Sequence, residues 1–284
     1  MRPSSILPLL FLPLLLAACG PRRHTPSLRR PAGRAEIPLP QPTPSGKDAA
    51  ATAPDSPGPA ISLLPVGGKA AGIILHRTAY DLSYNPELRI PNWVAWHLTA
   101  EHLRGKASRK DIPFHEDEDV PMPRATTYDY IQSGYDRGHL CPAGDNKWDR
   151  RAMEESFLLT NVCPQNPNLN RGDWNELEMQ CRDWARRYGD LHIVCGPILL
   201  NRRHKTIGRN RITVPEAFFK VILCTGRKPK AIGFVYRNTD GNRPKDSYVN
   251  TVDQVERITG LDFFSGLPDD VETEVEASAS LADW

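Results

Sequence analysis

The residues Asp136-Arg137-Gly138-His139 bring an acid, a permanent cation, a glycine and a titratable base together within four positions. Histidine is the side chain best suited to move protons near neutral pH. Arginine keeps its charge, and its planar guanidinium matches a phosphate group. Glycine lets the backbone turn sharply or approach a ligand closely. This combination predicts chemistry on a phosphate ester, with His139 as the base.

Hydrolysis of a phosphodiester also needs positive charge near the phosphate oxygens and a stabilised leaving oxygen, which a divalent metal commonly provides. Magnesium takes oxygen ligands and keeps several waters. Asn170 and Glu178 are the best oxygen donors, two turns apart in a segment predicted to be one helix that starts near Asn170. Asn170 offers an amide oxygen to the metal, and Glu178 a carboxylate that could orient metal-bound water. Asn161, on a predicted intervening strand, is expected to hold the site together by hydrogen bonds.

Each of these residues also has a structural interpretation. Asn170 is a residue type that caps helices, and Glu178 fits a solvated helix position. Arg137 could be an ion-pair partner of Asp136, and His139 a hydrogen-bonded structural histidine. The sequence leaves these alternatives open for each residue taken alone.

The elements that must position these residues follow from apolar periodicity. Apolar side chains recur at steps of three and four from about Asn170 to Tyr188, which predicts a long helix. Thr251 and Gln254 form a capping-box pattern that predicts a second helix ending at Gly260. A short helix is expected at 150–156, and strands at 72–77, 92–99, 157–163, 191–200, 217–224 and 230–237.

Charge is nearly balanced over the 284 residues, at +2, but it is unevenly distributed. Residues 200–230 hold nine Lys or Arg against one acid, whereas residues 262–284 hold seven acids and no Lys or Arg. A basic stripe suits a face that binds a polyanion. A solvated surface is the other interpretation of such a run.

The N-terminus has the pattern of a targeting signal, with Arg2, an apolar run over 6–16 and small residues before Cys19. A cysteine at that place resembles a bacterial lipobox, which predicts a lipid anchor on Cys19 and a location in a bacterial cell envelope. An ordinary secretory signal is the alternative. Residues 20–60 hold ten of the 27 prolines without apolar periodicity, which predicts a disordered tether. A domain is expected at 61–268, followed by a disordered acidic tail at 269–284.

Five cysteines remain after Cys19, an odd number that cannot pair completely. An exported protein permits one or two disulfides, but spacing alone does not give their pairing. No cysteine or histidine spacing matches a structural zinc site.

Taken together, the block from Asp136 to His139, then Asn161, then Asn170 and Glu178 resemble the DNA/RNA non-specific endonucleases, which include Serratia-type nucleases and endonuclease G. The resemblance covers roughly residues 73–268. It implies an α+β ββα-metal fold, in which a site of two strands and a helix is set in a larger, mostly antiparallel sheet with flanking helices.

The resemblance also implies roles. His139 would be the general base, and Asn170 the only direct protein ligand of one Mg²⁺, for which Mn²⁺ could substitute. Glu178 would bind a metal water, Arg137 would stabilise the transition state, and Asp136 would orient its neighbours. A second arginine often precedes the motif in this family, and the weak local match is Arg109. Cleavage would leave 5′-phosphate ends.

The sequence therefore predicts a metal-dependent endonuclease for DNA and RNA with little sequence preference, because backbone contacts carry no sequence information. The expected partners are DNA and RNA, a membrane through the lipid anchor, and a second copy of the chain in a homodimer. Two rival functions remain at this point. One is an inactive surface protein that binds polyanions, and the other is a phosphodiesterase for small molecules.

Overall fold

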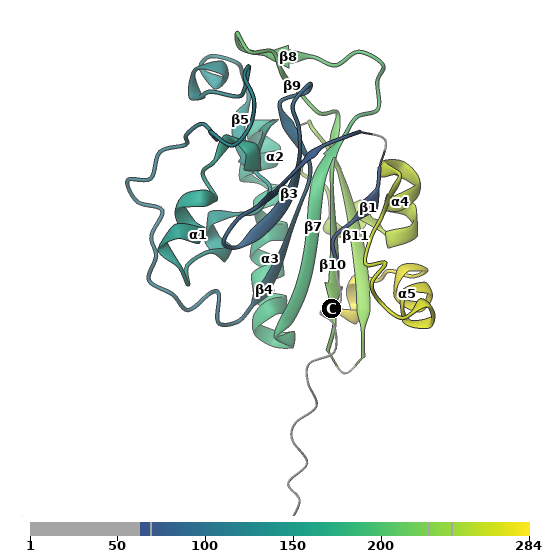
Figure 1. Ribbon diagram of the computed structural model, residues 1–284. Coiled ribbons are helices and arrows are strands. Elements are labelled where there is room, and N and C mark those ends of the chain that lie inside the picture. The colour runs from purple at the N-terminus through teal and green to yellow at the C-terminus, as the bar shows by residue number, and fades with distance from the viewer. Residues whose placement is uncertain (1–62, 69, 227, 240) are drawn as a thin grey trace, which may run out of the picture. The chain divides into compact units, whose positions relative to one another are not determined.

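The computed structural model describes residues 63–284, except residues 69, 227 and 240 (Figure 1). The predicted signal at residues 1–19, with its Cys19, and the predicted tether at residues 20–60 lie outside the described residues. Within the part that is described, no helix combines the length and the apolar character that a membrane span requires.

A seven-stranded antiparallel sheet forms the centre of the domain, in the strand order β12-β11-β10-β7-β4-β3-β2. The four longest strands match predicted strands, and all eight residues of β10 are buried, as expected where both faces of a sheet are covered. The predicted α+β class is confirmed. The strands are β2 (Ile73–His76), β3 (Tyr80–Asn85), β4 (Ile90–Thr99), β7 (Asp190–Ile198), β10 (Ala217–Cys224), β11 (Lys230–Arg237) and β12 (Val249–Asn250).

Helix α3 (Asp173–Tyr188) covers one face of this sheet and packs against β4 and β7 (Figure 1). Its buried side chains include Trp174, Leu177, Cys181 and Trp184, which are the residues of the predicted stripe. Burial of this stripe fixes the rotation of α3, so the next face of the helix is turned toward the candidate site.

Two shorter helices, α4 (Val252–Thr259) and α5 (Asp269–Glu276), cover the opposite face (Figure 1). The predicted capping box of α4 is present, because Thr251 accepts a hydrogen bond from the backbone of Gln254, and the Gln254 side chain accepts one from the backbone of Thr251. Helix α4 ends at Thr259 and is capped by Gly260, whose φ of 73° lies in the left-handed region that favours glycine.

Short elements complete the domain. Three small antiparallel pairs join β1 (Val66–Gly67) to β13 (Leu261–Asp262), β5 (Asp136–His139) to β6 (Val162–Gln165), and β8 (Thr206–Ile207) to β9 (Ile212–Thr213). The remaining helices are α1 (Arg150–Glu155) and α2 (Pro167–Arg171), with 3₁₀ turns at Thr127–Tyr130, Ala143–Asp145, Leu159–Asn161, Lys245–Tyr248 and Leu281–Asp283.

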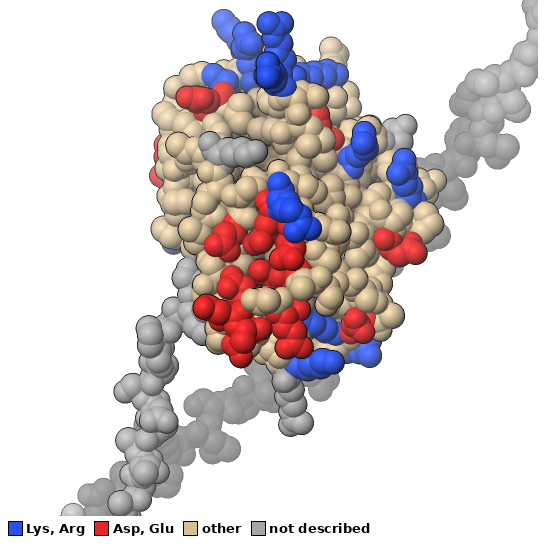
Figure 2. All heavy atoms as spheres, turned by 90° about the vertical axis from the view of Figure 1, so that its right-hand side faces the viewer, with Lys and Arg blue, Asp and Glu red and all other residues tan. Residues whose placement is uncertain are grey.

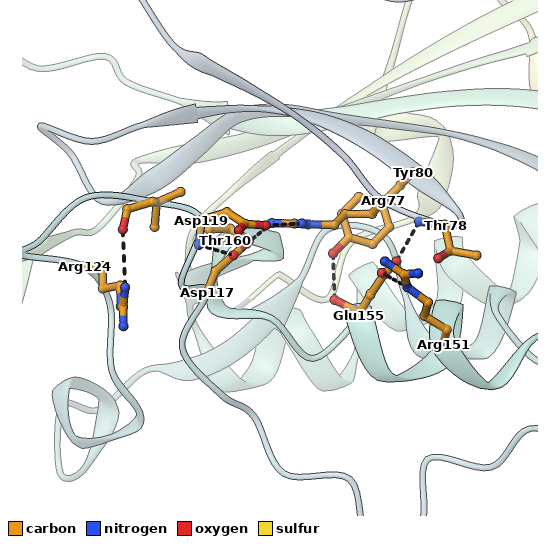
Figure 3. A network of polar contacts seen from close by, with 10 residues as sticks. Arg77, Thr78, Tyr80, Asp117, Asp119, Arg124, Arg151, Glu155 and Thr160 are labelled. Atoms are coloured by element: carbon orange, nitrogen blue, oxygen red, sulfur yellow. Dashed lines mark hydrogen bonds and ion pairs between the residues drawn. The ribbon is translucent and has the colours of Figure 1, made fainter.

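A polar network holds the long loop between β4 and β5 in place (Figure 3). The Arg77 guanidinium donates to Asp117 at 2.6 Å and to Asp119 at 2.7 Å. The buried carboxylate of Asp117 also accepts a hydrogen bond from the Thr160 hydroxyl at 2.6 Å. Because Thr160 directly precedes Asn161, this network links the loop to the turn that carries Asn161 (Figure 3).

The acidic segment at 269–284 folds back onto the domain, so the predicted disordered tail is wrong. After α5 the chain ends at Trp284, which is buried and lies 4.6 Å from the ring of Trp184. The Tyr188 hydroxyl donates to the Trp284 carbonyl at 2.7 Å. Burial of the Trp284 ring stabilises the folded position of this segment, although the residues before it are mostly polar or acidic.

The five cysteines beyond Cys19 are buried and free, so the disulfides that export would permit do not form among the described residues. They are Cys141, Cys163, Cys181, Cys195 and Cys224.

Candidate active site

A hollow of about 500 Å³ opens where β5, α2 and the first half of α3 meet. It brings together every candidate catalytic, metal-binding and substrate-binding residue, including the weakly supported Arg109, and leaves out only the supporting residue Asn161. The lining residues are Arg109, Phe114, Tyr130, Tyr135, Asp136, Arg137, His139, Asn170, Arg171, Asn175 and Glu178.

The glycine of the motif serves close packing between β5 and β6. A Cβ atom on Gly138 would lie 2.2 Å from Oε1 of Gln165 on the paired strand, which is far inside normal contact. The expectation of a sharp turn or a close ligand approach at Gly138 is therefore replaced by a packing requirement. With Gly138 in place, β5 pairs closely with β6, and its residues Asp136, Arg137 and His139 line the hollow.

Asn161 supports the site from behind, although it lies in a 3₁₀ turn and not on the predicted strand at 157–163. Its Oδ1 accepts the backbone N–H of Cys141 at 2.9 Å, and its Nδ2 donates to the carbonyls of Cys141 and Ser156. The side chain is fully buried. These three bonds fix the backbone just after His139.

The predicted long helix is two helices, because the chain breaks at Gly172, with φ −101° and ψ −113°. Asn170 consequently lies in the last turn of α2, and neither starts nor caps the helix that carries Glu178. The correction leaves the chemistry intact, since both side chains still line the same hollow.

Asp136 holds Asn170 in a defined orientation. The Asn170 Nδ2 donates to the Asp136 carboxylate at 3.0 Å, and Arg171 donates to both oxygens of that carboxylate at 2.8 and 2.7 Å. Burial raises the pKa of Asp136, but the bonds from Arg171 and Asn170 outweigh it and lower that pKa below its ordinary value. Because a carboxylate only accepts, the Asn170 amide must turn its nitrogen to Asp136, which leaves Oδ1 available to another partner.

His139 packs among aromatic rings, with centroid distances of 4.9 Å to Phe114 and 5.1 Å to Phe157. Its Nε2 is buried and has no hydrogen-bond partner among the described residues. Burial, and then the charge of Arg109, lower the pKa of His139 to about 3. The imidazole is therefore neutral over the physiological range, with a free nitrogen that can take a proton.

The pKa of Glu178 is shifted upward, in contrast to that of His139. Burial raises the pKa of its carboxyl group to about 7, and the ammonium of Lys220 opposes that rise. Lys220 is fully buried on β10, and its Nζ lies 4.3 Å from the centre of the Trp174 ring without a hydrogen-bond partner among the described residues. Burial lowers the pKa of Lys220, but the surrounding thiol and carboxyl groups outweigh it and raise that pKa. Lys220 thus acts as a buried positive charge behind the site.

The burial of Lys220 corrects the interpretation of residues 200–230 as one basic stripe. The first part of that run, around β8 and β9, remains exposed and carries Arg202, Arg203, Lys205, Arg209 and Arg211. Lys205 lies 4.8 Å from the centre of the Tyr135 ring, which lines the hollow, so this end of the exposed run borders the site. Figure 2 shows Lys and Arg side chains gathered at the top, the end at which β8 lies in Figure 1.

Arg137 does not pair with Asp136 within the described residues, because Arg171 occupies that carboxylate. Its guanidinium lies 5.1 Å from the Phe114 ring, and that of Arg109 lies 5.5 Å from the Phe157 ring. The hollow therefore contains two guanidinium groups without carboxylate partners among the described residues.

Sequence reasoning missed five residues of the hollow: Phe114, Tyr130, Tyr135, Arg171 and Asn175. Asn175 lies three residues before Glu178, and this helical spacing was a usable signal. Arg171 follows Asn170 directly, but its bond to Asp136 joins residues 35 positions apart. No local pattern marks the three aromatic residues.

Comparison with known proteins gives a consistent result. Residues 63–270 match the profile of a family described as DNA/RNA non-specific endonuclease. The chain is 35% identical over 239 residues to mitochondrial endonuclease G of Bos taurus, covering 79% of this chain and 80% of that protein. It is 39% identical over 222 residues to mitochondrial nuclease EXOG of Xenopus laevis, covering 72% of this chain but only 60% of that protein.

A solved structure described as the EndoG/EndoGI complex, on the mechanism of EndoG inhibition, shares the fold, with a TM-score of 0.67. Sequence identity is 31%, and the match covers 70% of this chain and 89% of the other.

The predicted location in a bacterial cell envelope is contradicted, because the endonuclease G and EXOG relatives are named as mitochondrial nucleases. Their names also give no support to a lipid anchor on Cys19 or to a homodimer.

Proposed function

Because this chain belongs to the DNA/RNA non-specific endonuclease family, and is thus a metal-dependent endonuclease, we propose that its hollow is the site of phosphodiester cleavage. The residues proposed to carry the reaction are His139, Arg137, Glu178, Asp136 and Asn170.

His139 acts as the general base that takes the proton of the attacking water. The support is a buried Nε2 without a partner among the described residues, on an imidazole that is neutral at physiological pH. Buried polar atoms are rarely left unpaired, because the loss costs about 1–3 kcal/mol. At a reactive centre, the substrate or its water supplies the missing partner.

Asn170 is the proposed protein ligand of a divalent metal, with Mg²⁺ as the native ion and Mn²⁺ as a substitute. The fit rests on the bond from Nδ2 to Asp136, which leaves the Asn170 Oδ1 free in a hollow lined by further oxygen donors. Hard cations prefer such oxygens, and Mg²⁺ keeps several waters. A bound metal would supply positive charge at the leaving oxygen.

Glu178 and the two free arginines complete the proposal. The Glu178 carboxylate accepts hydrogen bonds from water in the hollow once it has lost its proton. Arg137, with Arg109 beside His139, places fixed positive charge where negative charge develops on the phosphate oxygens. The convergence of His139, Asn170 and Glu178 in one hollow is the observation that carries the proposal.

DNA and RNA approach across the exposed cations of the β8–β9 region, which contact the sugar–phosphate backbone. Such contacts place the substrate without reading its bases. We expect products with 5′-phosphate ends, since the metal-assisted leaving group is the 3′ oxygen.

Digestion of supercoiled plasmid and of RNA tests this proposal. The wild type and the control His76→Ala, at an exposed histidine away from the hollow, should cleave both substrates with Mg²⁺ and neither with EDTA. His139→Ala should lose about 10²–10⁴-fold in rate. Binding of plasmid without cleavage by the wild type would instead support the inactive polyanion binder. Turnover of a small aryl phosphodiester alone would support the small-molecule phosphodiesterase.

A further inference from the structure

One buried carboxyl group, on the face of the sheet opposite to α3, has an oxygen without a hydrogen-bond partner among the described residues. Glu276, at the end of α5, is only 6% exposed, and its Oε1 has no hydrogen-bond partner among the described residues. A buried charged group without a partner is strongly unfavourable, so such groups are paired or bind metals. Glu276 must therefore either keep its proton or find a partner outside the described side chains.

The surroundings of Glu276 are acidic. Asp253 and Glu256 on α4 each place a carboxylate oxygen close to that of Glu276, and the three oxygens lie within 4.8 Å of one another. Burial, and then the charges of Glu256 and further carboxylates, raise the pKa of Glu276 to about 8. Among the described residues, no lysine or arginine forms an ion pair with these three carboxylates.

The geometry suits one ion. Oxygens bound to the same Ca²⁺ lie about 2.3–2.6 Å from it, so any two of them are at most about 5 Å apart. The observed limit of 4.8 Å is compatible with this condition. Glu256 is also held in place, because its Oε1 accepts the backbone N–H of Phe263 at 2.8 Å.

We propose that Asp253, Glu256 and Glu276 bind a calcium ion that fastens α5 to α4. Figure 2 shows a patch of Asp and Glu side chains on the side of the molecule where α4 and α5 lie in Figure 1. Three carboxylates without histidine or cysteine favour a hard cation over zinc. Flexible coordination by several carboxylates favours Ca²⁺ over Mg²⁺, which takes few protein ligands.

This site is distinct from the catalytic hollow. Helices α4 and α5 cover the face of the sheet opposite to α3, and none of the three carboxylates lines the hollow (Figure 1). The calcium ion is therefore a stabilising ligand, and its loss should lower the melting temperature while leaving the catalytic residues in place.

Thermal unfolding and calorimetric titration with CaCl₂ test the proposal. Both use the full chain after removal of metal, in an Asn170→Ala background that disables the proposed catalytic ligand. One ion should bind per chain, and the Tm should rise with the logarithm of calcium concentration. Glu276→Gln should abolish both effects. The matched control Glu274→Gln, at an exposed acid on the same helix, should retain both.

Glu276→Gln should also raise the Tm measured without calcium, because folding then no longer has to bury a carboxylate or take up a proton there. This gain separates loss of the site from simple misfolding. A wild-type Tm that does not respond to calcium would overturn the proposal, and so would a response that survives in Glu276→Gln. An equal response to MgCl₂ would overturn the assignment to calcium.

Discussion

The carboxyl group of Glu178 is the group on which the pH dependence of activity should depend. Its pKa in the folded chain is about 7, above the ordinary value of 4.5, mainly because it is buried. The proton must leave before the carboxylate can accept hydrogen bonds, so kcat/KM should rise with pH to a midpoint no higher than about 7. Glu178→Gln should be slower and should lose this acid limb, which a pH–rate profile of DNA cleavage would detect.

Loss of the Glu178 proton, which should raise the rate, should lower the stability of the folded chain. A raised pKa means that the folded chain holds the proton more tightly than the unfolded chain does. The contribution of Glu178 to the free energy of unfolding is therefore fully present below pH 4.5 and is lost as pH rises to about 7.

If Glu178→Gln keeps the acid limb of the wild-type pH–rate profile, a group other than Glu178 controls the rate.

Asp136 should control metal affinity through Asn170. In Asp136→Ala, the Asn170 amide loses its hydrogen-bond acceptor and Arg171 loses its ion pair. Loss of such an orienting group typically costs about 10–100-fold in metal affinity. The Mg²⁺ concentration for half-maximal cleavage should rise by that factor, and should stay unchanged in Glu176→Ala, at an exposed residue of α3. An unchanged Mg²⁺ requirement in Asp136→Ala would separate Asp136 from the metal.

The residues that line the hollow could be predicted where they belong to a motif with a fixed order and spacing, as for His139, Asn170 and Glu178. Pairings could not, because the contact of Arg171 with Asp136 depends on the tertiary fold. The burial of Lys220 did leave a signal in the sequence. It is the single charged residue in the apolar strand β10, and a strand covered on both faces offers it no solvated side.

At the level of elements, the two strands of the motif depend on the absence of a side chain at Gly138. Gly138→Ala should place Cβ about 2.2 Å from Oε1 of Gln165 and destabilise the domain by about 1–3 kcal/mol. Urea unfolding would measure this loss. Gly226→Ala is the matched control, since its nearest neighbour lies at 3.7 Å.

A second substitution checks the mechanism. The double variant Gly138→Ala/Gln165→Ala removes Oε1 and Cδ of Gln165 but keeps its Cβ, 2.6 Å away, so its loss of stability relative to Gln165→Ala alone should be smaller but not zero. Equal losses in both backgrounds would mean that crowding by Gln165 is not the cause.

Long, periodic elements were predictable because their apolar stripes reflect burial, as α3 and β10 show. The break at Gly172 was missed, although the step of five residues from Leu169 to Trp174 departs from the spacing of a continuous apolar stripe. The packing of Trp284 against Trp184 also left no local signal, since a distant partner decides it.

At the scale of the whole molecule, cations border the hollow and acids lie on the α4–α5 face (Figure 2). Arg203→Gln/Arg209→Gln should therefore weaken duplex binding at all sequences. It should also reduce the slope of log Kd against log salt by about 0.9 for each phosphate that the variant no longer neutralises. Binding is measured without metal in a His139→Ala background.

Lys228→Gln/Arg257→Gln is the matched control, because it removes two exposed cations outside the β8–β9 region. Equal effects of the two double variants would show that net charge, and not the border of the hollow, governs binding.

The central claim is that the His139 imidazole deprotonates the attacking water. Its most direct test is chemical rescue of His139→Gly, in which free imidazole can occupy the space left between Phe114 and Phe157. We predict that added imidazole restores plasmid cleavage by His139→Gly with Mg²⁺ present, and leaves the Asn170→Ala variant inactive. Wild-type cleavage by His139→Gly without imidazole would contradict the account.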